Sequence, residues 1–328
     1  MVFATPPPPL DVTTVFPELG PLARPAVRLH PRAGAPGADD SSLGGPLLWP
    51  AGEPWLVCHG QLLAEWRERI MPEDFRRFRD GEIQDKAELH RIVAGAGRID
   101  MITGERVFLL PRPHQQPPPL VPVVQLYARD VPELPFPHHT DLFQLLWCPN
   151  WHAAPWYGPH PIAVWRSAAQ VDQRLAAPPA PRFDGLDSDL APDDYVPRPC
   201  VVHPERVVEY PCRYDLPDGL VERVKRWDEE EGGGRYRAEL STAPGAKIGG
   251  HPRWIQRPEW PACRCGRRMH HLLTIASGEF GSAERWTRPA DRGAWAPHGI
   301  KLGGGGGSLY LFTCTVCPER PLAGVLQR

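Results

Sequence analysis

Two pairs of cysteines near the end of the chain have the spacing of metal ligands. Cys263-x-Cys265 is followed by a glycine that permits a turn, and Cys314-x2-Cys317 has the spacing of a zinc ribbon. Four thiolates around Zn²⁺ form a closed, structural site. We therefore predict that these four cysteines bind one structural zinc ion. The alternative is a set of reduced thiols in the core, since free cysteine is often buried.

The first half of the chain has cysteines at the matching places. Cys58 and Cys148 each have a histidine nearby, at His59 and His152. Thiolate and imidazole are both good zinc ligands. We name Cys58, Cys148 and His152 as a candidate second metal site. The alternative is that they are core positions left over from a duplicated fold.

One loop could support acid/base chemistry. His138-His139-x-Asp141 could supply acid and base groups, and an acid/base or metal-dependent enzyme using this loop is the alternative function. Three polar residues on a proline-rich loop are, however, more often simply solvated. The sequence contains no Gly-x-Ser-x-Gly, no His-Glu-x-x-His and no Walker loop. We therefore name no catalytic residue.

The composition of the 328-residue chain disfavours several classes of partner. Lys and Arg (37) nearly balance Asp and Glu (39), so no net positive field exists to hold nucleic acid or an anionic membrane. No apolar run reaches the roughly 18 residues that a membrane span needs. The first residues lack the basic and apolar regions of a signal peptide. We therefore expect a cytoplasmic location, where paired cysteines bind metal rather than form disulfides.

An internal repeat is the main indication of the fold. The pattern Gly-Gly-x3-Trp-x5-Trp-x2-Cys begins at Gly44 and again at Gly249. Dense apolar runs, typical of central strands, follow each copy. These runs are 120–127 and 142–148 in the first copy and 271–276 and 309–314 in the second. We predict an α+β fold built on a β-rich, duplicated core of two sequence-similar halves.

The rest of the chain is organised around the two copies. We predict a helical insertion over 60–110, because Leu62, Leu63, Trp66 and Ile70 share one helical face. Within the linker, we predict a strand at 206–210 and a helix at 216–227. The predicted parts are a Pro-rich N-terminal segment (1–40), a first β-rich repeat with the insertion (41–165), a linker (166–246), and a second β-rich repeat with the cysteine cluster (247–328).

Several of these motifs resemble a bacterial family. Residues 247–256 read Lys-Ile-Gly-Gly-His-Pro-Arg-Trp-Ile-Gln, and a Gly-x-Leu-Tyr-Leu-Phe run ends at Phe312. Both resemble the YwqG-like domain-of-unknown-function family, as do 121–125 and the strand 141–147. The order Gly-Gly, Trp, Cys, Leu-Leu, Leu-Phe-x-Cys is similar, more distantly, to the programmed cell death protein 2 family. The resemblance covers roughly residues 43–318.

The resemblance has consequences for fold and function. It implies an α+β fold with a duplicated β-rich core, and it implies no enzyme activity, because no catalytic residues are established for the bacterial family. The eukaryotic relatives look like dedicated holders of a ribosomal protein, which implies that a client protein binds in a groove. The chain departs from the family pattern at Cys263-x-Cys265, which is one residue tighter than Cys-x2-Cys.

We therefore expect a non-catalytic protein-binding module with a structural zinc site. Its role would be chaperone-like or immunity-like, and its partner would be a protein. The six-residue step between the tryptophans places both on one face of an extended segment. We predict that Trp49 and Trp254 are buried core anchors. We predict that Trp55 and Trp260 lie nearer the surface and contact the partner.

Overall fold

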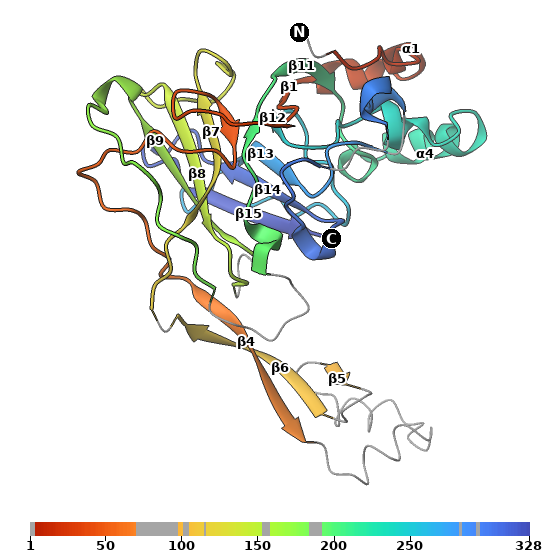
Figure 1. The fold of residues 1–328 in the computed structure, drawn as a ribbon. Coiled ribbons are helices and arrows are strands. Elements are labelled where there is room, and N and C mark those ends of the chain that lie inside the picture. Colours follow the sequence, from red (N-terminus) through yellow and green to blue (C-terminus); the bar gives the residue numbers. More distant parts are fainter. Residues whose placement is uncertain are drawn as a thin grey trace.

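The protein is built mainly from two six-stranded antiparallel sheets (Figure 1). The computed structural model describes residues 4–69, 98–100, 105–114, 116–152, 158–183, 192–281, 284–292 and 296–328. Helices are few and short, so the predicted β-rich α+β class is confirmed.

The first sheet, sheet A, contains the strands of the second repeat. In spatial order its strands are β11 (Glu205–Glu209), β1 (Arg24–Arg28), β12 (Lys247–Gly249), β13 (His270–Ala276), β14 (Ser308–Thr313) and β15 (Leu322–Gln327). The second sheet, sheet B, contains the strands of the first repeat. Its order is β2 (Arg32–Ala33), β10 (Cys200–Val201), β3 (Ser42–Leu43), β7 (Val121–Tyr127), β8 (Leu142–Cys148) and β9 (His160–Arg166).

The helices connect the strands or flank the sheets. The α-helices are α1 (Val12–Val15) and α4 (Leu220–Glu230). A π-helical turn, η5, spans Tyr236–Leu240. The 3₁₀ turns are η1 (Pro17–Leu22), η2 (Ala168–Gln170), η3 (Pro192–Tyr195), η4 (Arg213–Asp215), η6 (Glu284–Trp286), η7 (Pro289–Asp291) and η8 (Leu302–Gly304).

The two sheets have the same internal strand order. In sheet A it is β12-β13-β14-β15, and in sheet B it is β3-β7-β8-β9. The register shifts at the same place in both, between His271 and Leu273 and between Pro122 and Val124. A duplication requires this common order, and the duplication itself stays a prediction.

The first glycine of each repeat occupies a left-handed backbone conformation. Gly44 has φ 68° and Gly249 has φ 66°, a region that glycine enters without the steric cost of a side chain. At Gly44 a Cβ would lie 2.6 Å from the carbonyl oxygen of Arg198. The repeat therefore begins with glycine because the chain turns sharply there, and in the first copy also because a neighbouring backbone is too close for a side chain.

The N-terminal segment and the linker tie the two sheets together. Strand β1 precedes the first repeat in sequence but pairs with β12 of the second repeat. Strand β10 comes from the linker but pairs with β3 of the first repeat. The predicted linker strand is present as β11, which pairs with β1. Each sheet is therefore completed by strands from outside its own repeat.

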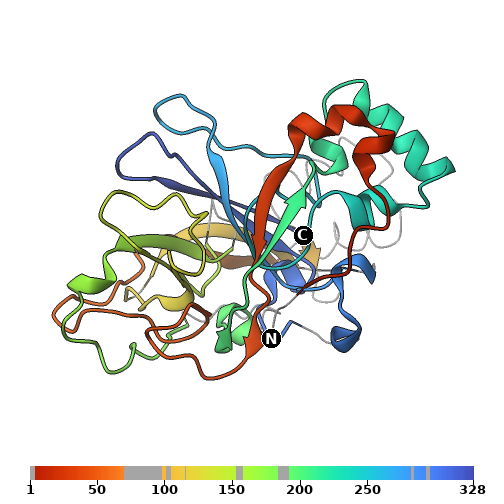
Figure 2. The ribbon, with the colours of Figure 1, turned by 90° about the horizontal axis from the view of Figure 1, so that it is seen from above.

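Figure 2 shows the two sheets from above, and a shared apolar core lies between them. Alternate residues of each strand enter it, as the two-residue period of strands requires. From β8 these are Phe143, Leu145 and Trp147, and from β14 they are Leu309 and Leu311, all fully buried. The two sheets therefore pack face to face.

The outer face of each sheet is covered by its tryptophan motif. In sheet A, Trp254 packs on Tyr310 and Phe312 of β14, with ring centroids 4.9 and 5.9 Å away. In sheet B, Trp49 belongs to the cluster that includes Leu146 of β8. Trp49 is 0% exposed and Trp254 is 4% exposed, so their predicted burial is confirmed. Their companions Trp55 and Trp260 are half-buried, also as predicted.

The predicted helix over 62–70 is wrong. Residues Gln61–Arg69 form strand β4, which pairs along its whole length with β6 (Glu105–Pro113), and β5 (Arg98–Asp100) pairs with β6 on the other side. Figure 1 shows this small sheet extending away from the two larger ones. Positions 62, 64 and 66 also satisfy a two-residue period, and a distant partner rich in Val, Phe and Leu decides in favour of the strand. The helices predicted near 72–78 and 89–93 lie outside the described residues.

The linker helix packs against the N-terminal segment. Helix α4 begins four residues later than the predicted 216, and its buried residues Leu220 and Val224 join a cluster with Phe16 and Leu19. The Phe16 ring lies edge-on to Trp227, 5.7 Å between centroids. The N-terminal segment is thus held by apolar contacts that begin before Phe16, since Val12 belongs to the same cluster.

The burial of the tryptophans predicts unequal effects of truncation. Trp254→Ala empties a filled site over β14 and should lower the free energy of unfolding by about 3–5 kcal/mol. Trp260→Ala should cost less, because its ring already faces solvent in part. Urea unfolding of both variants at fixed metal content measures the difference. A larger loss for Trp260→Ala would reverse the assignment of core and surface.

Candidate metal centres

The four predicted cysteines of the second repeat converge at one point. The Sγ atoms of Cys263 and Cys317 lie 3.6 Å apart, and those of Cys265 and Cys314 lie 3.7 Å apart. All four sulfurs lie within 4.8 Å of one another. A tetrahedral ion with metal–sulfur bonds near 2.3 Å places its sulfurs about 3.8 Å apart. The four sulfurs therefore have the spacing of a tetrahedral metal site.

A tight turn presents the first cysteine pair. The N–H of Cys263 donates to the Arg267 carbonyl (2.7 Å), and the N–H of Gly266 donates to the Cys263 carbonyl (2.8 Å). Gly266 has φ 81°, which glycine adopts without strain. The turn directs Cys263 and Cys265 toward the same point although only one residue separates them.

The second cysteine pair lies in the connection between β14 and β15. Cys314 directly follows the last residue of β14, and its N–H donates to the Pro321 carbonyl (3.3 Å). The N–H of Arg320 donates to the Cys317 carbonyl (3.0 Å), which closes the turn. Two adjacent strands of sheet A thus fix the position of this pair.

The local electrostatics favour a bound cation. Backbone N–H groups of Cys317 and Val316 donate to the Cys314 sulfur and lower the pKa of that thiol to about 6. The surrounding sulfurs raise the pKa of Cys317 to about 12. Thiolates this close repel one another, so full ionisation of the cluster requires a cation at its centre.

A second cluster lies on sheet B and includes every residue predicted for it. Cys58 Sγ lies 3.2 Å from His152 Nε2, and Cys148 Sγ lies 3.9 Å from His114 Nε2. These four ligand atoms all lie within 4.8 Å of one another. The Nδ1 atom of His160 is a further 3.6 Å neighbour of the Cys58 sulfur. The predicted trio thus becomes a four-ligand cluster.

Surrounding groups orient the ligands of this second cluster. His152 Nδ1 lies 3.1 Å from the Gly158 carbonyl, and donation to that oxygen leaves Nε2 with a lone pair facing the sulfurs. The Asn150 amide donates to the Cys148 sulfur, and the Gly60 N–H donates to the Cys58 sulfur, both at a distance of 3.3 Å. A Cβ on Gly60 would lie 2.6 Å from His160 Nδ1, so a residue without a side chain is needed there.

The two buried thiols of this cluster share their ionisation. A hydrogen bond from the Cys148 thiol, together with those from the nearby histidines, holds the pKa of Cys58 far below its usual range. Burial, and then the Cys58 sulfur, raise the pKa of Cys148 well above its usual range. One thiolate is favoured without a metal, and a divalent cation would stabilise the second.

The two clusters occupy corresponding places in their sheets. Cys58 and Cys263 each follow the second tryptophan of the repeat by three residues. Cys148 ends β8 and Cys314 follows β14, the corresponding strand of the other sheet. Histidines supply the other two ligand positions on sheet B. The described chain therefore contains one such cluster on each sheet.

Sequence reasoning missed one ligand of the second cluster. His114 follows β6 and stands alone in sequence, 34 residues before Cys148. Ligand searches rely on short spacings, and only the strand pairing that ends near His114 brings it to the sulfurs. His59, the sequence neighbour of Cys58, is exposed and belongs to neither cluster.

The alternative acid/base residues do not form an enclosed site. His138 and His139 are exposed, and their ring centroids lie 6.4 Å apart. Asp141 is also exposed, and its Oδ1 accepts a hydrogen bond from the Ala168 N–H (2.7 Å). The Asp141 carboxylate therefore binds a backbone N–H, and all three side chains are exposed to solvent.

A groove lies beside the cysteine cluster. Its walls are Glu259, Trp260 and Pro261 on one side and Leu322–Val325 of strand β15 on the other. The Trp260 indole N–H donates to Asp215 Oδ1 (2.8 Å), and the Arg268 guanidinium lies 3.7 Å from the centroid of the Trp260 ring. Trp260 is thereby fixed at the surface with one side toward the groove.

Comparison with known proteins adds no family to this description. No family model matches the chain, and no curated protein matches it. Among the described residues, no helix combines the length and apolarity needed to cross a bilayer. The class that the geometry defines is a β-rich protein with two Cys/His clusters that could each hold a metal ion.

The two clusters predict the metal content of the chain. Protein purified without chelator should contain about two divalent metal ions per chain, one for each four-ligand cluster. Cys314→Ser and Cys148→Ser should each remove about one of them, because each removes a ligand from a different cluster. Elemental analysis of the folded variants measures this directly.

A buried thiol outside both clusters provides the control. Cys200 lies in β10 within the shared core, and burial raises its pKa to about 11. Cys200→Ala should therefore retain the metal content of the unaltered protein. Equal loss of metal in all three variants, or a metal-free native chain, would contradict two separate sites.

Proposed function

We propose that the protein is a non-catalytic protein-binding module stabilised by structural zinc. Zinc is supported by the donor chemistry, since four thiolates in one cluster and two thiolates with two imidazoles in the other are its usual ligand sets. Four protein ligands leave no open coordination position, as in structural sites. Elemental analysis identifies the metal. A cytoplasmic location belongs to the same proposal, because reduced thiols are available there.

The groove beside Trp260 is the observation that carries protein binding. Strand β15 lies at the end of sheet A, and within the described part of the chain it has a ladder partner on one side only. An edge strand offers unpaired N–H and C=O groups to an added strand. Trp260 forms the opposite wall of the groove, and tryptophan is enriched among residues that dominate binding energy.

The occupant that fits this groove is an extended segment of a client protein. An added strand would place every second side chain against Trp260. The adjacent cysteine turn carries Arg264, Arg267 and Arg268, all exposed. These cations favour a client segment with acidic residues beside its apolar ones. Chaperone-like holding and immunity-like capture would both use such a contact, and the resemblance to the YwqG-like and programmed cell death protein 2 families supports client binding.

Trp55 has the corresponding position on sheet B. Its indole N–H donates to the Leu120 carbonyl (2.8 Å), and its ring lies 4.9 Å from Trp49. Partner contact at Trp55 is part of the proposal as a second surface, whereas the groove that carries the argument lies at Trp260.

The proposal is tested with one client and matched variants. Proteins captured by the chain from its native host would be identified, produced separately, and titrated against the unaltered chain. Trp260→Ala and Arg267→Glu should each weaken binding by about tenfold or more, because one removes the apolar wall and the other reverses a cation at the rim.

Two controls separate binding from stability. Arg226→Glu reverses an exposed charge on helix α4, away from the groove, and should leave affinity unchanged. Elemental analysis of each variant shows that both metal sites are intact. Equal affinity of Trp260→Ala and the unaltered chain for the client would reject the groove as the binding surface.

A further inference from the structure

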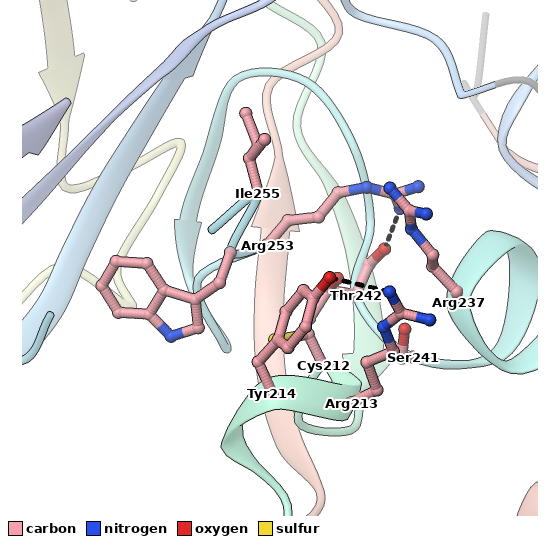
Figure 3. Close-up of a pocket in the computed structure, with 9 residues that line it drawn as sticks. Cys212, Arg213, Tyr214, Arg237, Ser241, Thr242, Arg253 and Ile255 are labelled. Carbon is pink, nitrogen blue, oxygen red and sulfur yellow. Dashed lines mark hydrogen bonds between the residues drawn. The ribbon is translucent and has the colours of Figure 1, made fainter. Parts of the chain in front are cut away.

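A pocket separate from the groove at Trp260 is lined by Trp254 and by three arginines. Figure 3 shows it between the η4 turn, η5 with the residues that follow it, and the segment that carries Arg253 and Ile255. Its cavity volume is about 50 Å³, and it opens to solvent. Three of its nine lining residues are arginines, Arg213, Arg237 and Arg253, and none is Asp or Glu.

Two of the three guanidinium groups donate hydrogen bonds to uncharged acceptors. Arg253 Nη1 donates to the Thr242 carbonyl (2.6 Å), and Arg213 Nη2 donates to the Tyr214 hydroxyl (2.7 Å). Within the described ranges, none of the three pairs with a carboxylate at ion-pair distance. Burial, and the like charge of Arg237, lower the pKa of Arg253. The pocket lining therefore holds three cations and no carboxylate, and Glu209, which lies beyond ion-pair distance, attracts Arg253 only through its charge.

Buried polar atoms of the pocket lack partners as well. Thr242 is 1% exposed, and its hydroxyl makes no hydrogen bond among the residues that the structure describes. The Nε atom of Arg213 is also buried and makes no hydrogen bond among those residues. Buried polar atoms are nearly always satisfied in native proteins, by protein, water or a ligand. An unpartnered hydroxyl and an unpartnered guanidinium N–H in one cationic pocket point to a missing acceptor.

We propose that this pocket binds a phosphate group. Arginine forks match the oxygens of phosphate, and a dianion balances three cations better than a single carboxylate does. The hydroxyl of Thr242 and the Nε–H of Arg213 would then donate to phosphate oxygens. The group could belong to free phosphate or to a phosphorylated side chain, since both present the same oxygens. This site does not depend on client binding at the groove.

The test uses the full, metal-loaded chain and inorganic phosphate. Calorimetric titration at constant ionic strength should show saturable binding of about one phosphate per chain. Arg237 is exposed, so Arg237→Gln should fold normally and weaken binding by about tenfold or more. Arg235→Gln removes an exposed charge two residues away, outside the pocket lining, and should bind as the unaltered chain does.

Further arms test the chemistry and the source. Thr242→Val keeps the side-chain shape without the hydroxyl and should also weaken binding. Acetate should bind more weakly than phosphate. A phosphoserine peptide that binds more tightly than phosphate would support the site and assign it to phosphoproteins, whereas weaker peptide binding would support the site and assign it to free phosphate. Absence of saturable phosphate binding, or equal affinity in Arg237→Gln and Arg235→Gln, would overturn the proposal.

Discussion

Both faces of each large sheet are apolar, and this constraint determines much of the remaining structure. One face of each sheet packs against the other sheet. The outer face, with residues such as Phe312 and Leu146, must be covered by other parts of the chain. The cover is a short tryptophan segment outside the regular strand ladders, and isolated backbone bonds such as that from the Leu175 N–H to the Trp49 carbonyl (2.8 Å) hold it. A ligand cluster links each cover to the end of a central strand, at Cys263 and Cys314 in one case and at Cys58 and Cys148 in the other.

The two tryptophan segments that cover the sheets are held by different contacts at the ends away from their cysteines. In sheet A, the fully buried Glu209 accepts from Lys247 Nζ at 2.6 and 2.7 Å and from the His251 N–H at 2.9 Å. A Cβ on Gly250 would lie 2.3 Å from this carboxylate, which accounts for the second glycine of the repeat. In sheet B, the amide of Gln125 accepts from the Leu48 N–H (2.7 Å). Similar covers are therefore held by an ion pair in one sheet and by a neutral amide in the other.

The sequence predicted local features well and long-range pairings poorly. The central strands, the buried Trp49 and Trp254, and the cysteine pairs each have a signal within a few residues. The pairing of β1 with the second repeat and of β10 with the first has no such signal, because a short apolar strand could pair with either sheet. His114 has no short-range signal for the same reason, and residues 61–69 match a helical pattern although they form β4, because the partner strand lies about 40 residues away in sequence. Distant residues that meet only in the folded chain carry no short-range pattern.

The four-cysteine cluster on sheet A bears on both proposed binding surfaces. Trp254 and Cys263 belong to one apolar cluster with Phe312, and Trp260 packs against it. Trp254 lines the cationic pocket, and Trp260 lines the groove along β15. The two rings lie 5.6 Å apart, so a shift of one changes the packing of the other. Since the ring positions depend on a segment fixed at one end by Cys263, a metal at the cluster would hold the walls of pocket and groove together. A structural ion can in this way support binding without touching a ligand.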